Sequence, residues 1–292
     1  MTATEAPQAP AAHPGTHLGV VHLTARDLPR LVTFYRDHLG LRVHREADGF
    51  AALGAGGPDL LHLTGNPAAV RHDRVAGLYH FCLKVDDRRD LARWLAHLVQ
   101  AGTPLAGLVD HRFSEAIYLD DPEGNGVELN WDRPRADWPD PSVVIRLGNA
   151  PLDIDGLQGL LDGAPPWDGA PADTTVSHIH LHVSDLDAAG RFYCDVIGFG
   201  RVMEMPRQAI FTSAGGYHHH VAANVWKGRG IPAAPEGAAG LASFTITVPT
   251  VADREGILAR AGAAGIPVAG TGDLPSLRDP AGNRIVLAID PA

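Results

Sequence analysis

The stretch Ser177-His178-Ile179-His180-Leu181-His182-Val183 alternates histidine with an aliphatic residue. Successive side chains of a β-strand point to opposite faces of the sheet, so the three histidines share one face and the three aliphatic residues share the other. The aliphatic face is suited to packing beneath a helix. A face with three imidazoles lines a cavity, binds a metal or meets water, and the rest of the sequence helps to distinguish these roles.

Size and composition set broad limits on the protein. The chain has 292 residues, enough for one large domain or two ordinary ones, and 45% of them are hydrophobic. The net charge of −10 argues against a general partner of nucleic acid or of anionic membranes. Cys82 and Cys194 lie far apart and outside any CxxC pattern, which disfavours a disulfide framework and fits a reducing compartment.

The sequence gives no sign of targeting to a membrane. No apolar run reaches membrane-spanning length. Residues 1–16 begin rich in Ala and Pro and lack the basic and then apolar pattern of a signal peptide. We therefore expect a disordered N-terminal lead and a cytoplasmic protein.

An internal repeat divides the chain into two homologous halves. The motif Asp121-Pro122-Glu123-Gly124-Asn125 recurs 158 residues later as Asp279-Pro280-Ala281-Gly282-Asn283. A Phe-Tyr pair begins at Phe34 and recurs with the same spacing at Phe192. One spacing shared by separate motifs is hard to obtain by chance and indicates duplication.

We predict an N-terminal domain over residues 17–131, a linker over 132–176 and a C-terminal domain over 177–290. Each domain divides into two modules, and in each module a strand is followed by a helix and further strands. The fold class is therefore α+β, with four βαβββ modules in two homologous domains. Helices are expected over residues 28–38, 89–101, 186–196 and 251–263.

The repeated motifs resemble the vicinal oxygen chelate superfamily, whose fold pairs βαβββ modules around a metal. Within it, residues 17–290 are most similar to the two-domain extradiol ring-cleavage dioxygenases of the catechol 2,3-dioxygenase type. Three stretches carry this resemblance, namely residues 110–119, residues 121–129 and Gly216-Tyr217-His218-His219-His220. The resemblance implies a role in aromatic catabolism.

The resemblance also places metal ligands in the first and last strands of a module. Modules two and three carry His80, Glu128 and His178 at these positions. Two histidines and one carboxylate form the facial triad of non-haem Fe(II) oxygenases, which leaves coordination positions open. We expect Fe(II), or alternatively Mn(II), where module two meets module three, within one chain or across a swapped dimer. The equivalent positions in modules one and four are Val20, Ser243 and Val286.

Extradiol cleavage also needs proton transfer, for which a histidine is suited. The resemblance places this residue in the last strand of the third module, where we favour His220 over His218 and His219. Strand alternation would put His220 on one face with Asn224 and Trp226.

The resemblance identifies Tyr118, ten residues before Glu128, as the tyrosine that hydrogen-bonds a substrate oxygen. His111, Ser114, Asn224 and Trp226 are expected around the substrate. A lone strand histidine is more often a satisfied polar residue than a ligand, and we assign five to that class: His22, His44, His62, His97 and His180.

The sequence predicts a metal-dependent extradiol dioxygenase that acts on catechol or a substituted catechol with O2. We expect a homo-oligomer without nucleic-acid or membrane partners. One alternative is a glyoxalase-like lyase or isomerase, which normally uses a second glutamate ligand where module three has histidines. The other is a metal-free drug-binding protein of the same fold, which has no need to retain the ligands.

Overall fold

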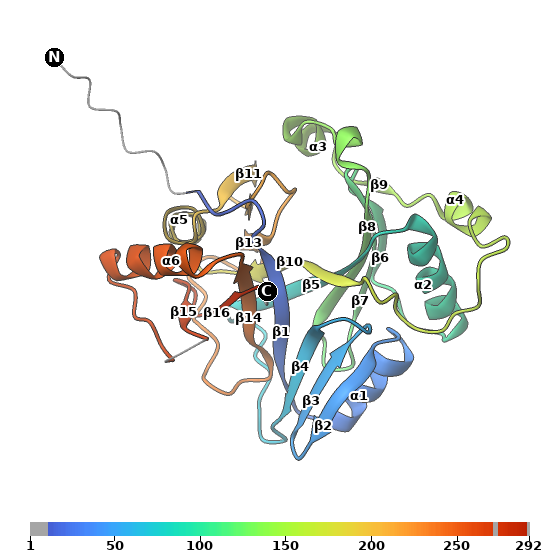
Figure 1. The fold of residues 1–292 in the computed structure, drawn as a ribbon, viewed down its shortest axis with the longest axis horizontal. Helices are drawn as coiled ribbons and strands as arrows, with labels where there is room; N and C mark the ends of the chain where they lie inside the picture. The colour runs from blue at the N-terminus through green and yellow to red at the C-terminus, as the bar shows by residue number, and fades with distance from the viewer. Residues whose placement is uncertain (1–10, 271–273, 291–292) are drawn as a thin grey trace.

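The computed structural model describes residues 11–270 and 274–290, which form two β-sheets (Figure 1). A seven-stranded sheet has the order β15-β16-β14-β1-β4-β3-β2, and a nine-stranded sheet has the order β11-β12-β13-β10-β5-β8-β7-β6-β9. The strands of the first are β1 (His17–Ala25), β2 (Arg42–Ala47), β3 (Phe50–Gly54), β4 (Asp59–Gly65), β14 (Gly240–Val248), β15 (Ser276–Arg278) and β16 (Arg284–Ile289). Those of the second are β5 (Gly77–Val85), β6 (Gly107–Asp110), β7 (Ser114–Asp120), β8 (Gly126–Asp132), β9 (Ala150–Pro151), β10 (Thr175–His182), β11 (Gly200–Met205), β12 (Ala209–Ser213) and β13 (Val221–Asn224).

Each sheet joins modules from opposite halves of the sequence. Strand β1 of module one runs antiparallel to β14 of module four. Strand β5 of module two runs antiparallel to β10 of module three. The expected α+β fold of βαβββ modules is confirmed, and the junction of modules two and three forms within one chain.

Helices α1 and α2 lie on one side of the molecule and α5 and α6 on the other (Figure 1). Asp27 caps α1 by accepting a hydrogen bond from the backbone N–H of Arg30, and Asp185 caps α5 in the same way through Ala188. The helices are α1 (Leu28–Asp37), α2 (Arg88–Gln100), α3 (Pro141–Leu147), α4 (Ile154–Gly159), α5 (Leu186–Arg191), which continues as a π-helical segment over Phe192–Ile197, and α6 (Val251–Ala263).

The repeated sequence motifs meet in space and join the two modules of each half. The Tyr35 hydroxyl in module one donates a hydrogen bond to Oδ2 of Asp121 in module two, at 2.8 Å. Tyr193 donates to Asp279 in the same way at 2.9 Å. Oδ1 of Asp121 also accepts the backbone N–H of Asn125, which closes the turn. Each buried aspartate therefore fixes its own turn and a neighbouring module.

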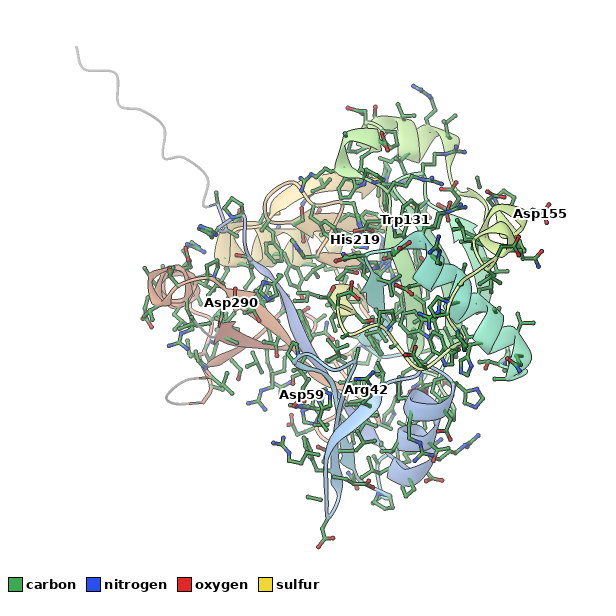
Figure 2. All side chains as sticks on the ribbon, turned by 45° about the vertical axis from the view of Figure 1, so that its right-hand side comes forward. Arg42, Asp59, Trp131, Asp155, His219 and Asp290 are labelled. Atoms are coloured by element: carbon green, nitrogen blue, oxygen red, sulfur yellow. The ribbon has the colours of Figure 1, made fainter. Side chains whose placement is uncertain are left out.

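The linker between the halves is partly ordered by contacts with module two. Arg93 of α2 donates a hydrogen bond to the carbonyl of Pro166 at 2.7 Å. Helix α4, which carries Asp155, lies at the outer edge of the molecule (Figure 2). Helix α3 lies against β11 of module three. The linker therefore reaches both modules that build the nine-stranded sheet.

Of the expected N-terminal lead, residues 1–10 lie outside the described residues. Farther along, the Ala12 N–H donates a hydrogen bond to the carbonyl of Gly198 at 2.7 Å, and Thr16 is buried. Of the helices in the described residues, none combines the length and the apolar character needed to cross a membrane.

Replacing Tyr35 with Phe removes one hydrogen bond to a buried carboxylate, which should lower the free energy of unfolding by about 1–3 kcal/mol. Urea denaturation measures this change. The matched control is Tyr79→Phe, because Tyr79 is 41% exposed, and its effect should stay within about 0.5 kcal/mol. Equal losses in the two variants would contradict a stabilising role for the Tyr35–Asp121 hydrogen bond.

Candidate metal centre and substrate cavity

His80, Glu128 and His178 lie on three neighbouring strands, in the order β10-β5-β8. Cys82 of β5 is the register partner of both His178 and Glu128. His80 precedes Cys82 by two residues, so it emerges on the same face of the sheet. Nε2 of His80 and Nε2 of His178 each lie 3.0 Å from Oε2 of Glu128. One ligand atom from each residue therefore lies within 4.8 Å of the others.

The burial of these three side chains fits a metal ion. Their exposed fractions are 5% for His80, 2% for Glu128 and 1% for His178. Neither ring nitrogen of His80 makes a hydrogen bond, although Nε2 is near the Glu128 carboxylate. Unpaired buried polar atoms are costly, and coordination would satisfy such a nitrogen. The donor set suits a divalent metal such as Fe(II).

The protonation states of the centre also suit metal binding. Burial lowers the pKa of His178, which favours the neutral imidazole that a metal requires. Burial alone would raise the pKa of Glu128, but the adjacent imidazoles of His178 and His80 hold it well below its usual range. The centre therefore presents an ionised carboxylate at Glu128 and a neutral imidazole at His178.

Gly126 allows β8 to approach β5 beside His80. It is the register partner of His80 in the parallel pair of strands. A Cβ atom at this position would lie 2.1 Å from the Tyr79 carbonyl oxygen and 3.1 Å from Cβ of His80. Gly126, the last residue of the Asp-Pro-x-Gly-Asn-Gly stretch, therefore lets β8 lie close enough to β5 to place Glu128 next to the two histidines.

The three consecutive histidines at positions 218–220 precede β13 and are not part of it, because this strand begins at Val221. The expectation that they belong to the strand is therefore wrong, and strand alternation does not decide where they point. His219 lines the cavity described below, and its ring centroid lies 4.1 Å from that of His178. His220 instead accepts a hydrogen bond at Nδ1 from the Ala214 N–H and lies against Phe199.

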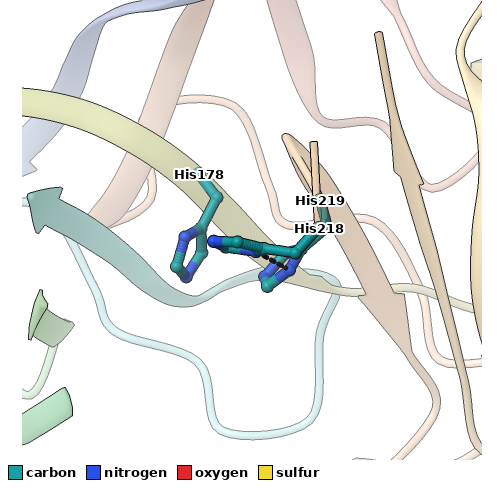
Figure 3. A group of neighbouring side chains, drawn as sticks. All are labelled: His178, His218 and His219. Atoms are coloured by element: carbon teal, nitrogen blue, oxygen red, sulfur yellow. Dashed lines mark hydrogen bonds between the residues drawn. The ribbon is translucent and has the colours of Figure 1, made fainter. Parts of the chain in front are cut away.

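His218 lies between His219, which lines the cavity, and Asp132. Its Nδ1 is 2.9 Å from Nδ1 of His219, and its Nε2 is 3.1 Å from Oδ1 of Asp132. Its ring stacks on Phe113 at 4.5 Å. Figure 3 shows His218 and His219 facing His178 from the segment before β13, and these three residues form a second group of possible ligands within 4.8 Å.

The metal centre opens onto a cavity of about 780 Å³. Tyr118 lines it directly opposite Glu128 on the paired strand, and its hydroxyl donates a hydrogen bond to Nε2 of His111 at 2.7 Å. Ser114 and Trp226 also line the cavity, and the Ser114 hydroxyl is buried without a hydrogen-bond partner. Four of the predicted substrate-side residues therefore surround one space.

Asn224, in contrast, does not contribute to the lining of this cavity. Its side-chain oxygen accepts hydrogen bonds from Nδ1 of His182 at 2.8 Å and from the Trp226 N–H at 3.0 Å. It is fully buried behind the wall. Its position supports a role in holding the wall of the cavity.

The assignment of His180 to the satisfied polar residues is wrong. It lines the cavity opposite His80 in the β10–β5 pair, with the two ring centroids 5.2 Å apart. Its Nε2 has no hydrogen-bond partner, and burial lowers its pKa well below the usual range. Strand alternation could have identified His180, because it lies two residues after His178 and shares a face of β10 with it.

The fold and the centre define a vicinal oxygen chelate protein whose two histidines and one glutamate suit a divalent metal. The family model of the Glyoxalase/Bleomycin resistance protein/Dioxygenase superfamily matches residues 17–129 and 175–287, and the chain belongs to this superfamily.

Similar proteins span nearly the whole chain. The catechol-2,3-dioxygenase of Bacillus subtilis is 40% identical over 273 residues, which cover 92% of this chain and 95% of that protein. A solved structure from Bacillus subtilis has a TM-score of 0.62 at 16% identity and covers 97% of this chain and 87% of its own. Glyoxalase I from Zea mays has a TM-score of 0.58 at 18% identity, with 94% and 92% covered. The two structural matches show the shared fold.

Replacing His178 with Ala should abolish tight metal binding, because it removes one of three ligands and leaves the Glu128 carboxylate with a single imidazole. Metal analysis of anaerobically purified protein should give about one metal ion per chain in the unaltered protein and a small fraction of that in the variant. The control is His44→Ala, which removes an exposed histidine. Equal metal content in all three proteins would contradict the assignment of this centre.

Proposed function

We propose that this protein is a metal-dependent extradiol dioxygenase that cleaves a catechol ring beside one hydroxyl with O2. The observation that carries the proposal is the buried group of His80, Glu128 and His178 beside a cavity that Tyr118 and His219 also line. The 40% identity to a catechol-2,3-dioxygenase supports it. Fe(II) is the proposed metal, and Mn(II) is the alternative.

His80, Glu128 and His178 would hold the metal, which when bound supplies the redox chemistry and open positions for the substrate oxygens and O2. His219 is the proposed acid–base residue in place of His220, because only His219 of these two lines the cavity. Its Nδ1 is paired with His218, which leaves Nε2 as the nitrogen able to exchange a proton with a catechol hydroxyl.

Tyr118 is the proposed hydrogen-bond donor to the substrate. Burial, and then the charge of Glu128, raise its pKa well above the usual range, so the phenol keeps its proton. In the structure this proton goes to His111, which offers Nε2 as the acceptor. A substrate oxygen that reaches the Tyr118 hydroxyl would take the place of His111 and be oriented relative to the metal centre.

The cavity walls favour a neutral, apolar substituent on the catechol. Among the described residues, neither arginine nor lysine lines the cavity, so a substrate carboxylate would find no cationic partner. Two methionines, Met203 and Met205, also line the cavity, and methionine side chains adapt to differently shaped apolar groups. The apolar part of the lining includes Val109, Phe113, Val144, Ile145, Met203, Met205, Phe211 and Trp226.

The glyoxalase alternative would be supported by a second carboxylate among the ligands. In the part of the chain that the structure describes, Glu128 is the sole carboxylate in the two groups of possible ligands. His219 and His218 lie on the side of the third module, where the sequence argument places a second glutamate in glyoxalases. The donor set therefore favours the dioxygenase.

Replacing His219 with Gln should lower kcat for O2 uptake with a catechol by roughly 10²–10⁴-fold, because the proton acceptor is lost. The matched control is His220→Gln, which alters a histidine outside the cavity and should lower kcat by less than about tenfold. Metal content measured on the same samples separates a catalytic loss from a loss of metal. A larger effect for His220→Gln would return the acid–base role to His220.

Substrate preference tests the apolar character of the cavity. We expect kcat/KM for 4-ethylcatechol to exceed that for 3,4-dihydroxybenzoate by at least about tenfold, because the two differ mainly by a carboxylate that would be left unpaired. O2 consumption with both compounds under identical conditions measures the ratio. Equal values, or a preference for the carboxylate, would contradict this substrate class while leaving dioxygenase activity in place.

A further inference from the structure

The seven-stranded sheet has a second cavity that corresponds to the metal cavity. His22 is the register partner of Ser243 across β1 and β14, as His180 is the partner of His80 across β10 and β5. His22 and Ser243 both line a cavity of about 210 Å³. Two copies of one scaffold therefore have a cavity at equivalent places, and within the described residues the possible metal ligands lie in one of them.

The second cavity is lined by cations although the chain has a net charge of −10. Arg71, Lys227 and Arg284 all line it, and none of them forms an ion pair with a carboxylate of the described residues. The guanidinium of Arg284 donates to the Ser276 hydroxyl at 3.1 Å, and that of Arg71 donates to the side-chain oxygen of Asn125 at 3.2 Å. These are neutral acceptors, so in the described residues no carboxylate lies within ion-pair distance of the three cations.

One further cation at this cavity is already neutralised. Arg278 pairs with Glu236 at 2.7 Å, and both residues belong to the lining. The lining does contain a carboxylate, that of Glu236, but Arg278 already pairs with it. Arg71, Lys227 and Arg284 are therefore the lysine and arginine residues of the lining that are left to hold an anion.

The electrostatic environment of Lys227 favours binding of an anion. Burial lowers the pKa of its ammonium group, and the charge of Arg71 lowers it further, while Asp73 acts in the opposite direction. A partly desolvated ammonium next to a second cation gains from a bound negative charge. Ser243 and Thr24, which also line the cavity, carry hydroxyls that can donate to an anion's oxygens.

We infer that the second cavity is a binding site for a small oxyanion of the phosphate type, held by Arg71, Lys227 and Arg284. Two guanidinium groups and one ammonium match the several oxygens of such an anion, because guanidinium donates in a planar fork and ammonium acts as a point charge. The small cavity volume fits an anion of this size and not an extended ligand. This site is independent of the proposed dioxygenase activity.

The anion site and the metal cavity share three chain segments. Leu78, Asn125 and Lys227 line the second cavity, and the next or preceding residue of each segment lines the metal cavity. The pairs are Leu78 with Tyr79, Asn125 with Gly126, and Lys227 with Trp226. A bound oxyanion would therefore contact the backbone segments that position His80 and the wall at Trp226.

Isothermal titration calorimetry with inorganic phosphate at constant ionic strength tests the site on the full chain. We expect saturable binding of one phosphate per chain, weakened by roughly tenfold or more in Lys227→Met and in Arg284→Gln, since each removes a charged hydrogen-bond donor. Arg229→Gln is the matched control, because Arg229 is an exposed cation two residues from Lys227 that does not line the cavity. It should leave the affinity within about twofold. Circular dichroism verifies that each variant is folded.

A Glu128→Ala variant distinguishes the two cavities, because it disrupts the metal centre and leaves the second cavity intact. Phosphate binding that persists in Glu128→Ala and falls in the two cation variants supports the site. Binding that is lost in Glu128→Ala and kept in Lys227→Met and Arg284→Gln would place phosphate at the metal and overturn the inference. Absence of saturable binding, or tighter binding of succinate than of phosphate, would also overturn it.

Discussion

The antiparallel pairing of β5 with β10 is the contact on which the rest of this structure depends. It places His80 next to His180 and sets Cys82 opposite His178, so the two ligand histidines face the same side of one sheet. β8 then adds Glu128 along the other edge of β5. A shift of one residue in either pairing would turn a ligand to the helix-covered face. The register of three strands therefore determines whether the centre exists.

That register is fixed from outside the sheet by contacts among all four modules. The sheets pair module one with four and module two with three, whereas the Tyr35–Asp121 and Tyr193–Asp279 hydrogen bonds join one with two and three with four. The four modules are thus connected in a closed ring. Because the Asp121 turn leads directly into β8, the same carboxylate that fixes the turn also positions the strand that carries Glu128.

The sequence predicted most elements because their signals are local. Asp27 and Asp185 cap helices, glycines end them, and the repeat spacing aligns strands of different modules. His80, Glu128 and His178 could be named because strand alternation holds at the ligand positions themselves, although the β10–β5 register shifts between His180 and Leu181. It failed for His220, because residues 218–220 precede the strand and follow a turn whose path depends on tertiary contacts such as His218 with Asp132. The pairing of modules within one chain was equally open, since a swapped dimer would bury the same faces.

The two cavities show how far one scaffold can diverge when its ligand positions change. In the nine-stranded sheet, the ligand positions hold the imidazoles of His80 and His178 and the carboxylate of Glu128, and such donors bind a metal cation. In the seven-stranded sheet, Ser243 occupies the position of His80 and Arg284 the position of Gly126, which reverses the sign of the local charge. Cations that converge on a cavity without carboxylate partners are stabilised by a bound counter-charge. The duplicated fold therefore keeps two concave sites that favour partners of opposite charge.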